Sequence, residues 1–476
     1  MSKSLAASIV LALYVPLCAA AKNPTEVPAA ELKSAQVANS TADILALKHD
    51  MAAMRQEYEA RLQALEARLH AAEAAAVQPQ TDANSVAAAV PMVSEPASTP
   101  VASANAFNPS ISLILSGTYT DTSREPSGYA ITGIRTAPDA ELGPGGRGFS
   151  LAETELDIAA NIDPWLRGAA NISLRPDDSV AVEEAYVQTT ALDHGFTVKG
   201  GRFFSGVGYL NEQHAHTWDF VDNPLAYQAF LGTQYADDGV QARWLAPTDL
   251  YLELGAELGA GKNFPGNSPG RNGVGMHSLF AHTGGDIGIS NSWRAGLSVL
   301  DTKANGQILT TSVGDVAIAR EFSGDHRVMV ADFIWKWAPN GNGTRTNFKL
   351  QGEYLRNRRD GVSSDPLTPN ALGHDSRSTE SGWYLQGIYQ FAKTWRFGLR
   401  TERIHPDQDE FARDFADTHV DGFTPRKTTV MLDYNPSEFT RLRLQLARDQ
   451  SQAGASDNEI SLQYQMSLGA HGAHKY

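Results

Sequence analysis

The stretch that decides the fold is the end of the chain, NEISLQYQMSLGAHGAHKY (residues 458–476). Apolar side chains occupy one parity of this stretch: Ile460, Leu462, Tyr464, Met466, Leu468 and Ala470. The alternate positions are polar: Ser461, Gln463, Gln465, Ser467 and His471. Because successive side chains of a strand point to opposite faces, this alternation predicts one long strand with an apolar face and a polar face.

The predicted strand continues to an aromatic last residue. An alternating final strand with Tyr464, Met466, Leu468 and Tyr476 resembles the C-terminal signal by which bacterial outer-membrane barrels are recognised and inserted. The alternative is an edge strand of a soluble β-domain, which would show the same alternation. Strands of soluble proteins are usually about five to six residues long. The greater length of this stretch favours the barrel.

The first residues predict export. Residues 1–21 carry Lys3, an apolar run from Leu5 to Cys18 and then three alanines, which is the pattern of a cleaved signal peptide. Cys18 is the single cysteine, so we expect a mature chain without disulfides. The net charge of −15 and the pI of about 5.3 argue against a nucleic-acid partner. No later run of apolar residues is long enough to predict a membrane-spanning helix.

A spacer (residues 22–40) leads to a region with helical periodicity, residues 41–76. Its apolar residues recur at steps of three and four: Ile44, Leu47, Met51, Met54, Tyr58, Leu62, Leu65, Leu69 and Ala72. This heptad seam, with one extra four-residue step at Tyr58, predicts a short oligomeric coiled-coil helix. The alternative is a lone amphipathic helix on a membrane or on its own barrel. Residues 77–106 are rich in Pro, Ala, Ser and Thr and predict a disordered linker.

Residues 107–476 alternate between strand patterns and turn signals. The short turn signals are Asp163-Pro164, Asp193-His194-Gly195, Ala246-Pro247-Thr248-Asp249, Asn291-Ser292, Pro339-Asn340-Gly341, Ala392-Lys393 and Asn435-Pro436-Ser437. Longer irregular stretches are expected at 121–148, 204–237, 259–275, 301–324, 357–380 and 404–424. Short turns that alternate with long loops join strands in pairs. We therefore expect an all-β fold, a transmembrane antiparallel β-barrel of about sixteen strands, with both ends on the short-turn side, the periplasm.

The strand patterns also favour a membrane over a soluble sandwich. Leu442, Leu444 and Leu446 alternate with Arg441, Arg443 and Gln445. Aromatic residues lie at predicted strand ends beside short turns: Trp165, Trp293, Trp335, Trp337, Phe391, Trp395 and Phe439. Such positions are typical of the aromatic girdle at a bilayer interface.

The polar parity of the strands should line the lumen, and its charges are sorted along the chain. Early strands carry acidic residues: Glu153, Glu155, Asp157, Glu183, Glu253 and Glu257. Late strands carry basic residues: Arg294, Lys349, Arg396, Arg400, Arg441 and Arg443, with Glu353 and Glu402 as exceptions. These charges, with Arg202, are our candidates for the pore lining or constriction. If the strands close in order, acidic and basic walls face each other and create a transverse field. The alternative is that each charge is paired with a neighbour.

Residues 205–237 are the longest candidate for a loop that folds into the lumen. The loop carries Tyr209, Trp218, Phe220, Tyr227, Phe230 and Tyr235, and such rings need a surface to pack against. His214 and His216, beside Glu212 and Asp219, are candidate metal ligands. Packing within the loop is the alternative. The chain shows no catalytic order of residues, nucleotide loop or paired-carboxylate motif, so we expect neither an enzyme nor a cofactor.

Two family resemblances add to this interpretation. Lys199-Gly200-Gly201-Arg202-Phe203, followed by Gly206-Val207-Gly208, resembles a strand and loop of the phosphate-selective porin O and P family, whose members form trimeric sixteen-stranded barrels. Most of residues 107–476 is similar to Gram-negative outer-membrane proteins often labelled TonB-dependent or zinc-regulated receptors. That similarity rests on Phe107-Asn108-Pro109, Gly148-Phe149-Ser150-Leu151, Gly201 to Phe220 and Trp244-Leu245-Ala246-Pro247-Thr248. A TonB-dependent transporter has about 22 strands and a plugged lumen, and no plug domain is predicted before this barrel.

These patterns predict an outer-membrane, porin-like channel for passive diffusion of small hydrophilic or ionic solutes. One alternative is a TonB-dependent or zinc-regulated receptor that takes up a metal or metal chelate. Another is a structural protein whose coiled coil engages the cell wall. The expected partners are outer-membrane lipid, the barrel-assembly machinery and further copies of the chain in a homotrimer, held through the barrel wall and the coiled coil. The N-terminal helix would lie in the periplasm.

Overall fold

The computed structural model describes residues 109–469 except 139, 153, 268–271, 314–315, 368–372 and 408–421. The predicted signal peptide, spacer, coiled-coil helix and linker lie outside these described residues. So do Glu153 and the end of the chain with Tyr476. Those predictions therefore stay predictions.

One antiparallel sheet contains all the strands of the described residues. The strands are β1 (Ser110–Thr122), β2 (Gly148–Leu151), β3 (Thr154–Asn161), β4 (Leu166–Leu174), β5 (Val180–Thr189), β6 (Phe196–Phe204), β7 (Ala236–Leu245), β8 (Tyr251–Gly259), β9 (Met276–Ile287), β10 (Asn291–Val313), β11 (Val316–Trp337), β12 (Asn347–Ser364), β13 (His374–Ala392), β14 (Trp395–His405), β15 (Arg426–Ser437), β16 (Thr440–Gln450) and β17 (Asp457–Gly469).

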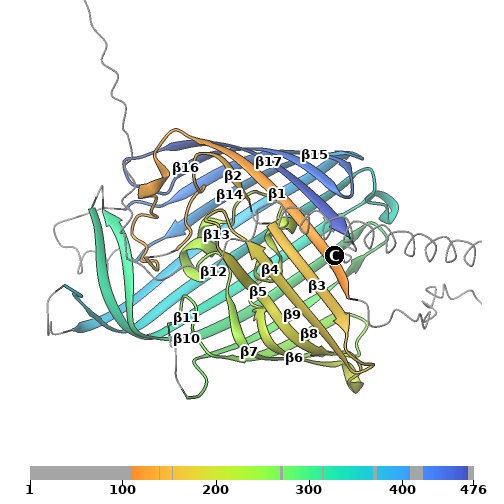
Figure 1. The fold of residues 1–476 in the computed structure, drawn as a ribbon, viewed down its shortest axis with the longest axis horizontal. Helices are drawn as coiled ribbons and strands as arrows, with labels where there is room; N and C mark the ends of the chain where they lie inside the picture. Colours follow the sequence, from red (N-terminus) through yellow and green to blue (C-terminus); the bar gives the residue numbers. More distant parts are fainter. Residues whose placement is uncertain are drawn as a thin grey trace, which may run out of the picture. The chain divides into compact units, whose positions relative to one another are not determined.

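The sheet closes into a barrel because its first and last strands pair with each other. The β1–β17 register runs from Ser112 opposite Gly469 to Thr122 opposite Glu459, and the two strands lie side by side in Figure 1. β2 and β3 lie end to end along β1 and share one position in the wall. The seventeen named strands therefore fill sixteen positions. The predicted sixteen-stranded antiparallel barrel is confirmed.

The alternation predicted for the final strands has its apolar face outward. On β16 the side chains of Leu442, Leu444 and Leu446 are exposed, whereas those of Arg443 and Gln445 are buried inside the barrel. On β17 the large apolar side chains Ile460, Leu462, Tyr464, Met466 and Leu468 are likewise exposed. An outward apolar surface around a closed barrel matches a lipid-facing wall.

Aromatic side chains lie on this outer face beside the short turns. The rings of Trp395 and Tyr434 are 4.8 Å apart, and those of Trp335 and Phe348 are 5.8 Å apart. Trp165, Phe391 and Phe439 are exposed at their turns. Amphipathic rings at this level suit the interface between lipid and water.

Two predicted loops are largely strand. We expected irregular chain at 301–324 and 357–380, but β10 and β11 continue through the first range, and β12 and β13 reach Ser364 and begin at His374. These strand ends carry polar residues on both parities, so the alternation that reveals a strand within the lipid layer is missing there. A register shift between Ala304 and Gln307 interrupts the β10–β11 ladder without ending it.

Helices are few and short in the described part of the chain. The α-helix is α2 (Leu225–Leu231). The 3-10 helices are Pro126–Gly128, Asp193–Gly195, Leu210–Glu212, Ala215–Thr217 and Pro339–Gly341. Among the described residues, no helix has the length and apolar character needed to cross a membrane.

Candidate functional site

Residues 205–235, which connect β6 to β7, form an inward segment that lies in the lumen. Most of its aromatic rings are buried: Trp218, Phe220, Tyr227, Phe230 and Tyr235. Phe220 packs with Ile388 and Met431 of the wall. The other four rings belong to one cluster with lumen-facing side chains such as Val330, Leu355 and Ile404. The predicted inward fold of this loop is confirmed by these contacts.

The two ends of the inward segment are tied together by one side chain. Asn211 Nδ2 donates to the carbonyl oxygens of Ser205 (2.8 Å) and Tyr235 (2.9 Å), and its Oδ1 accepts from the Tyr235 amide at 2.7 Å. The helix α2 starts after Pro224 and ends at Gly232, which has a left-handed φ of 61°. Glycine adopts this conformation without strain, so the helix stops and the chain turns back to β7.

Buried glutamates of the wall bind the backbone of the inward segment. Glu257 on β8 accepts from the Gly206 amide at 2.8 Å. Glu353 on β12 accepts from the amides of Tyr209 (3.1 Å) and Leu210 (3.0 Å). Glu402 on β14 accepts from the amide of Leu225, the first residue of α2. Ionised carboxylates form strong hydrogen bonds with amides, so these contacts fix the segment in the lumen.

Strands β12, β14 and β15 also bind the two aspartates of the inward segment. Asp219 pairs with Lys349 of β12 and, at 3.3 Å, with Arg396 of β14. Asp222 pairs with Arg400 of β14 at 2.9 Å and with Lys427 of β15 at 3.0 Å. Burial would raise the pKa of the Asp222 carboxyl, but the charges of Arg400 and Lys427 outweigh it and lower the pKa below its ordinary value.

The segment's backbone also accepts from β16 and β17. Arg443 Nη2 donates to the Trp218 carbonyl at 3.0 Å, and Arg441 Nη1 donates to the His216 carbonyl at 3.2 Å. Gln465 of β17 donates to the same His216 carbonyl at 3.1 Å. Contacts on β8, β12, β14, β15, β16 and β17 mean that the inward segment crosses the lumen.

The predicted metal candidates come together with predicted acidic residues. His216 Nδ1 is 2.8 Å from Glu155 of β3, and His214 Nδ1 is 3.7 Å from Glu183 of β5. His214 Nε2 is 3.0 Å from Glu184. This group, the His–Glu cluster, joins the segment to β3 and β5 and completes its contacts around the wall.

Charged side chains, some of which also bind the inward segment, lie on the wall strands near the short turns, in the part of the lumen that we call the vestibule. Two acidic residues of β3 and β8 form an acidic arc: Asp157 and Glu253. Five basic residues of β10, β11, β12, β14 and β16 form a basic arc: Arg294, Lys336, Lys349, Arg396 and Arg441. In the strand order of the barrel these two arcs occupy different parts of the wall. The predicted pairing with neighbours is found for Lys349 and Arg396, whereas the transverse field between acidic and basic walls stays a prediction.

The candidate Arg202 has a different position. In the β5–β6 register it lies opposite Ala185. It is three positions after Lys199, which packs over the Tyr186 ring, so the side chains of Arg202 and Lys199 point to opposite faces of the strand. Its side chain is 41% exposed and pairs with Asp238 at 2.8 Å. Arg202 therefore lies on the outer face of the wall and not in the lumen.

Several residues of the site were not singled out from the sequence. Asp433 of β15 binds Arg443 at 2.8 Å and also pairs with Arg396, and Lys427 lies on the same strand face. The step of two between Lys427, Thr429, Met431 and Asp433 is the signal that would have found them. Glu184 was missed for another reason. The β4–β5 register shifts by one residue there, so Glu183 and Glu184 do not point to opposite faces as neighbours in a regular strand would.

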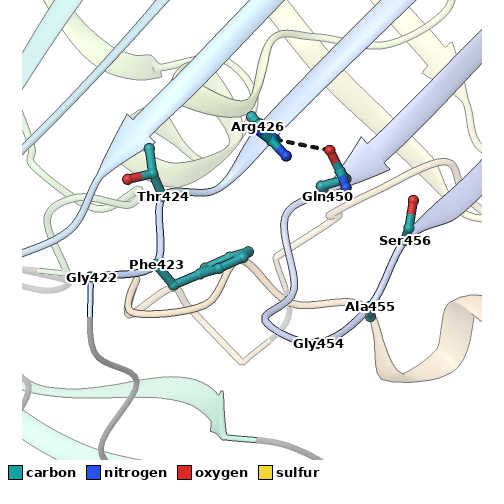
Figure 2. A pocket seen from close by; sticks show the side chains of 8 residues that line it. All are labelled: Gly422, Phe423, Thr424, Arg426, Gln450, Gly454, Ala455 and Ser456. Carbon is teal, nitrogen blue, oxygen red and sulfur yellow. Dashed lines mark hydrogen bonds between the residues drawn. The ribbon is translucent and has the colours of Figure 1, made fainter.

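A separate pocket lies at the rim of the barrel. Figure 2 shows it between the start of β15 and the connection from β16 to β17, where Arg426 donates to Gln450 at 2.9 Å. Among the residues that the structure describes, its lining includes Phe423, Thr424 and Ser456 and no acidic or histidine side chain.

Comparisons with known proteins agree with this architecture. The profile of a family described as "Putative beta-barrel porin-2, OmpL-like" matches residues 158–471. An uncharacterized protein of Aquifex aeolicus (strain VF5) is 31% identical over 402 residues, which cover 79% of this chain and 81% of that protein.

Solved structures with a similar shape are more distant in sequence. The anion-selective porin from Comamonas acidovorans is 12% identical, with a TM-score of 0.46 over 76% of this chain and 99% of that one. The outer membrane channel DcaP of Acinetobacter baumannii is 12% identical, with a TM-score of 0.46 over 76% of this chain and 97% of that one.

Proposed function

The chain belongs to the OmpL-like beta-barrel porin-2 family, and from this membership we propose that its inward segment sets the narrowest point of an outer-membrane channel. The protein is a porin-like channel for passive diffusion of small hydrophilic or ionic solutes. The observation that carries the proposal is the path of the segment. It starts at β6, contacts the wall on both sides and returns to β7.

The charges of the vestibule support ionic solutes. A solute that enters from the short-turn end meets the acidic arc on one side and the basic arc on the other. Charges at a water-filled constriction act on ions and dipoles more strongly than the same charges in bulk water. We infer that the two arcs together set the ion preference of the channel.

A passive channel accounts for the lumen better than an energised receptor. In a TonB-dependent transporter of about 22 strands the lumen holds a plug. Here the wall has sixteen positions, and the inward segment in its lumen is a connection between two of its own strands. Diffusion of a solute through a lumen lined by fixed charges also needs no catalytic group, which supports a non-enzymatic role.

The proposed channel is tested by planar-bilayer recordings of the purified protein. We expect stepwise conductance and a reversal potential in a salt gradient that depends on both arcs. Arg294→Gln with Arg441→Gln should shift the preference toward cations, and Asp157→Asn with Glu253→Gln should shift it toward anions. Arg327→Gln removes an exposed outer charge paired with Asp301 and is the control. It should change neither the conductance step nor the reversal potential. An absence of conductance steps would contradict the channel.

We also propose that the chain assembles as a homotrimer, with its heptad seam as one contact. Replacement of Leu62, Leu65 and Leu69 by Ala removes large apolar side chains from any packing between chains. Native mass spectrometry should then show a lower oligomer order or a less stable assembly. An unchanged trimer in this variant would mean that the barrel wall alone holds the subunits together.

A further inference from the structure

The His–Glu cluster combines residues from three separate parts of the chain. Glu155 lies on β3, Glu183 and Glu184 are neighbours on β5, and His214 and His216 belong to the inward segment. Nitrogen and carboxylate oxygen atoms that meet from several elements are the usual makeup of a transition-metal site.

A bulge brings two consecutive glutamates to this place. In the β4–β5 ladder Asn171 pairs with Glu184 and Ile172 pairs with Val182, so Glu183 has no partner residue on β4. An extra residue in one strand bends it and redirects a side chain. Both Glu183 and Glu184 thereby reach the same imidazole, His214.

The distances in the cluster are close to those of a metal coordination shell. His214 Nδ1 is 3.5 Å from Glu155 Oε2 and 3.7 Å from Glu183 Oε2. One ligand atom from each of these three residues lies within 4.8 Å of the others. Ligands bound at about 2.0–2.1 Å around a tetrahedral zinc ion are roughly 3.3 Å apart. The three side chains therefore need only small movements to share one ion.

The surrounding contacts hold these three ligands in place. His214 Nε2 lies 3.0 Å from Glu184 Oε2, so a proton on Nε2 leaves Nδ1 able to bind a metal. A carboxylate on the second nitrogen of a ligand histidine is the common way to orient its ring. Glu155 is held by His216 Nδ1 at 2.8 Å and by Asn171 Nδ2 at 3.0 Å.

Two atoms inside the cluster have unused binding capacity. Glu155 Oε1 and His214 Nδ1 are buried and make no hydrogen bond. The side chain of Glu155 is 0% exposed. Buried polar atoms without a partner are uncommon in folded proteins, because losing water without a replacement costs free energy. A cation bound at His214 Nδ1 would give this nitrogen a partner and offset the mutual repulsion of the carboxylates around it.

We propose that Glu155, Glu183 and His214 bind a divalent transition-metal ion such as zinc, with Glu184 and His216 as positioning residues. The side chain of His214 is 21% exposed, so water in the lumen reaches the site and can complete the coordination shell. An ion in this position joins the inward segment to β3 and β5. This inference rests on the geometry of the cluster and not on the proposed channel activity.

The test is a zinc titration of the full-length protein, purified without a polyhistidine tag and treated with a chelator. Isothermal titration calorimetry should show one zinc ion per chain, and cobalt should give the visible absorption of a low-symmetry nitrogen and oxygen site. A saturating excess of zinc, at about 100 times its Kd, should raise the unfolding temperature by roughly 2–5 °C. No saturable binding of either ion would overturn the proposal.

A graded set of variants assigns the site. His214→Ala and Glu183→Gln should each abolish binding, whereas Glu184→Gln should weaken it about 10–100-fold, as expected for a partner of a ligand. His277→Ala, an exposed histidine paired with Asp301 outside the cluster, should bind zinc as the parent does. Folding of each variant is checked by its heat-dependent migration on gels. Equal binding in the parent and His214→Ala would place the zinc elsewhere and contradict the assignment.

Discussion

Glu353 accepts hydrogen bonds from four donors: the amides of Tyr209 and Leu210 and the hydroxyls of Tyr227 and Tyr384. In the sequence, Glu353 is distinguished only as an acidic residue among the mostly basic residues of the late strands. Burial and the Glu353 charge raise the pKa of the Tyr227 hydroxyl well above its ordinary value, so this hydroxyl remains a donor. Glu353 is therefore an anchor for the inward segment and not a charge that faces the solute.

Glu353→Ala should destabilise the closed inward segment by about 2–4 kcal/mol, because it leaves several buried donors without an acceptor. We expect a lower midpoint of heat denaturation in detergent and larger fluctuations of the open-channel current. Glu353→Gln, which keeps one acceptor oxygen, should have a smaller effect. Asp325→Asn, at an exposed position, is the control. A Glu353→Ala protein that matches this control in both measurements would refute the anchor role.

Asp222 gives the segment a defined pH dependence. The pKa of this carboxyl is lower in the folded protein than in the unfolded chain. Its stabilising contribution is therefore complete above the unfolded pKa, about 4, and is lost as the pH falls through the lower folded pKa. The difference in unfolding midpoint between the parent and Asp222→Asn should be constant from pH 7.5 to 5 and shrink below about pH 4. A difference that already disappears between pH 7 and 5 would show that Asp222 is not held by Arg400 and Lys427.

At the scale of elements, the seam between β5 and β6 is short, with only four residue pairs in register. Its register covers Ala185 to Gln188 on β5 and Lys199 to Arg202 on β6. Gly201 lies in this seam with a φ of 131°, and a Cβ atom there would come within 2.2 Å of the Ala185 carbonyl oxygen. The seam lies next to the His–Glu cluster and at the start of the inward segment.

Gly201→Ala should lower the stability of the barrel by about 1–3 kcal/mol, because the backbone must leave a conformation that only glycine adopts easily. The heat-denaturation midpoint of the purified protein measures this change. Gly200→Ala is a matched control in the same strand, since nothing lies within 4 Å of an added Cβ atom there. Equal midpoints for the two variants would argue against strain at Gly201.

The sequence predicted elements where one face meets lipid and the other meets water, because only there does hydrophobicity alternate. That condition holds for β16 and β17. It fails at the ends of β10 to β13 away from the short turns, where the sequence predicts loops. The inward path of residues 205–235 was predictable from the rings that they carry. Their partners were not, because the hydrogen bonds to Glu257, Glu353 and Glu402 join residues far apart in the chain.

At the scale of the whole molecule, closure of the barrel turned a linear charge order into a spatial one. Once β17 pairs with β1, the early strands that carry acidic residues and the late strands that carry basic residues occupy different parts of one closed wall. The sequence contained this order, and the strand count was enough to expect the arrangement. It did not reveal that Arg202 faces outward or that a bulge adds Glu184, because both depend on register.

The central claim is that the inward segment sets the narrowest point of the channel, and single-channel conductance tests it most directly. Asn211–Gln228 is replaced by a short Gly/Ser linker, which leaves every strand with its backbone partners. We predict a larger conductance per step, a weaker ion preference and only a modest fall in heat stability. A conductance equal to that of the parent, in a variant that still folds as a barrel, would contradict the claim and place the constriction elsewhere in the lumen.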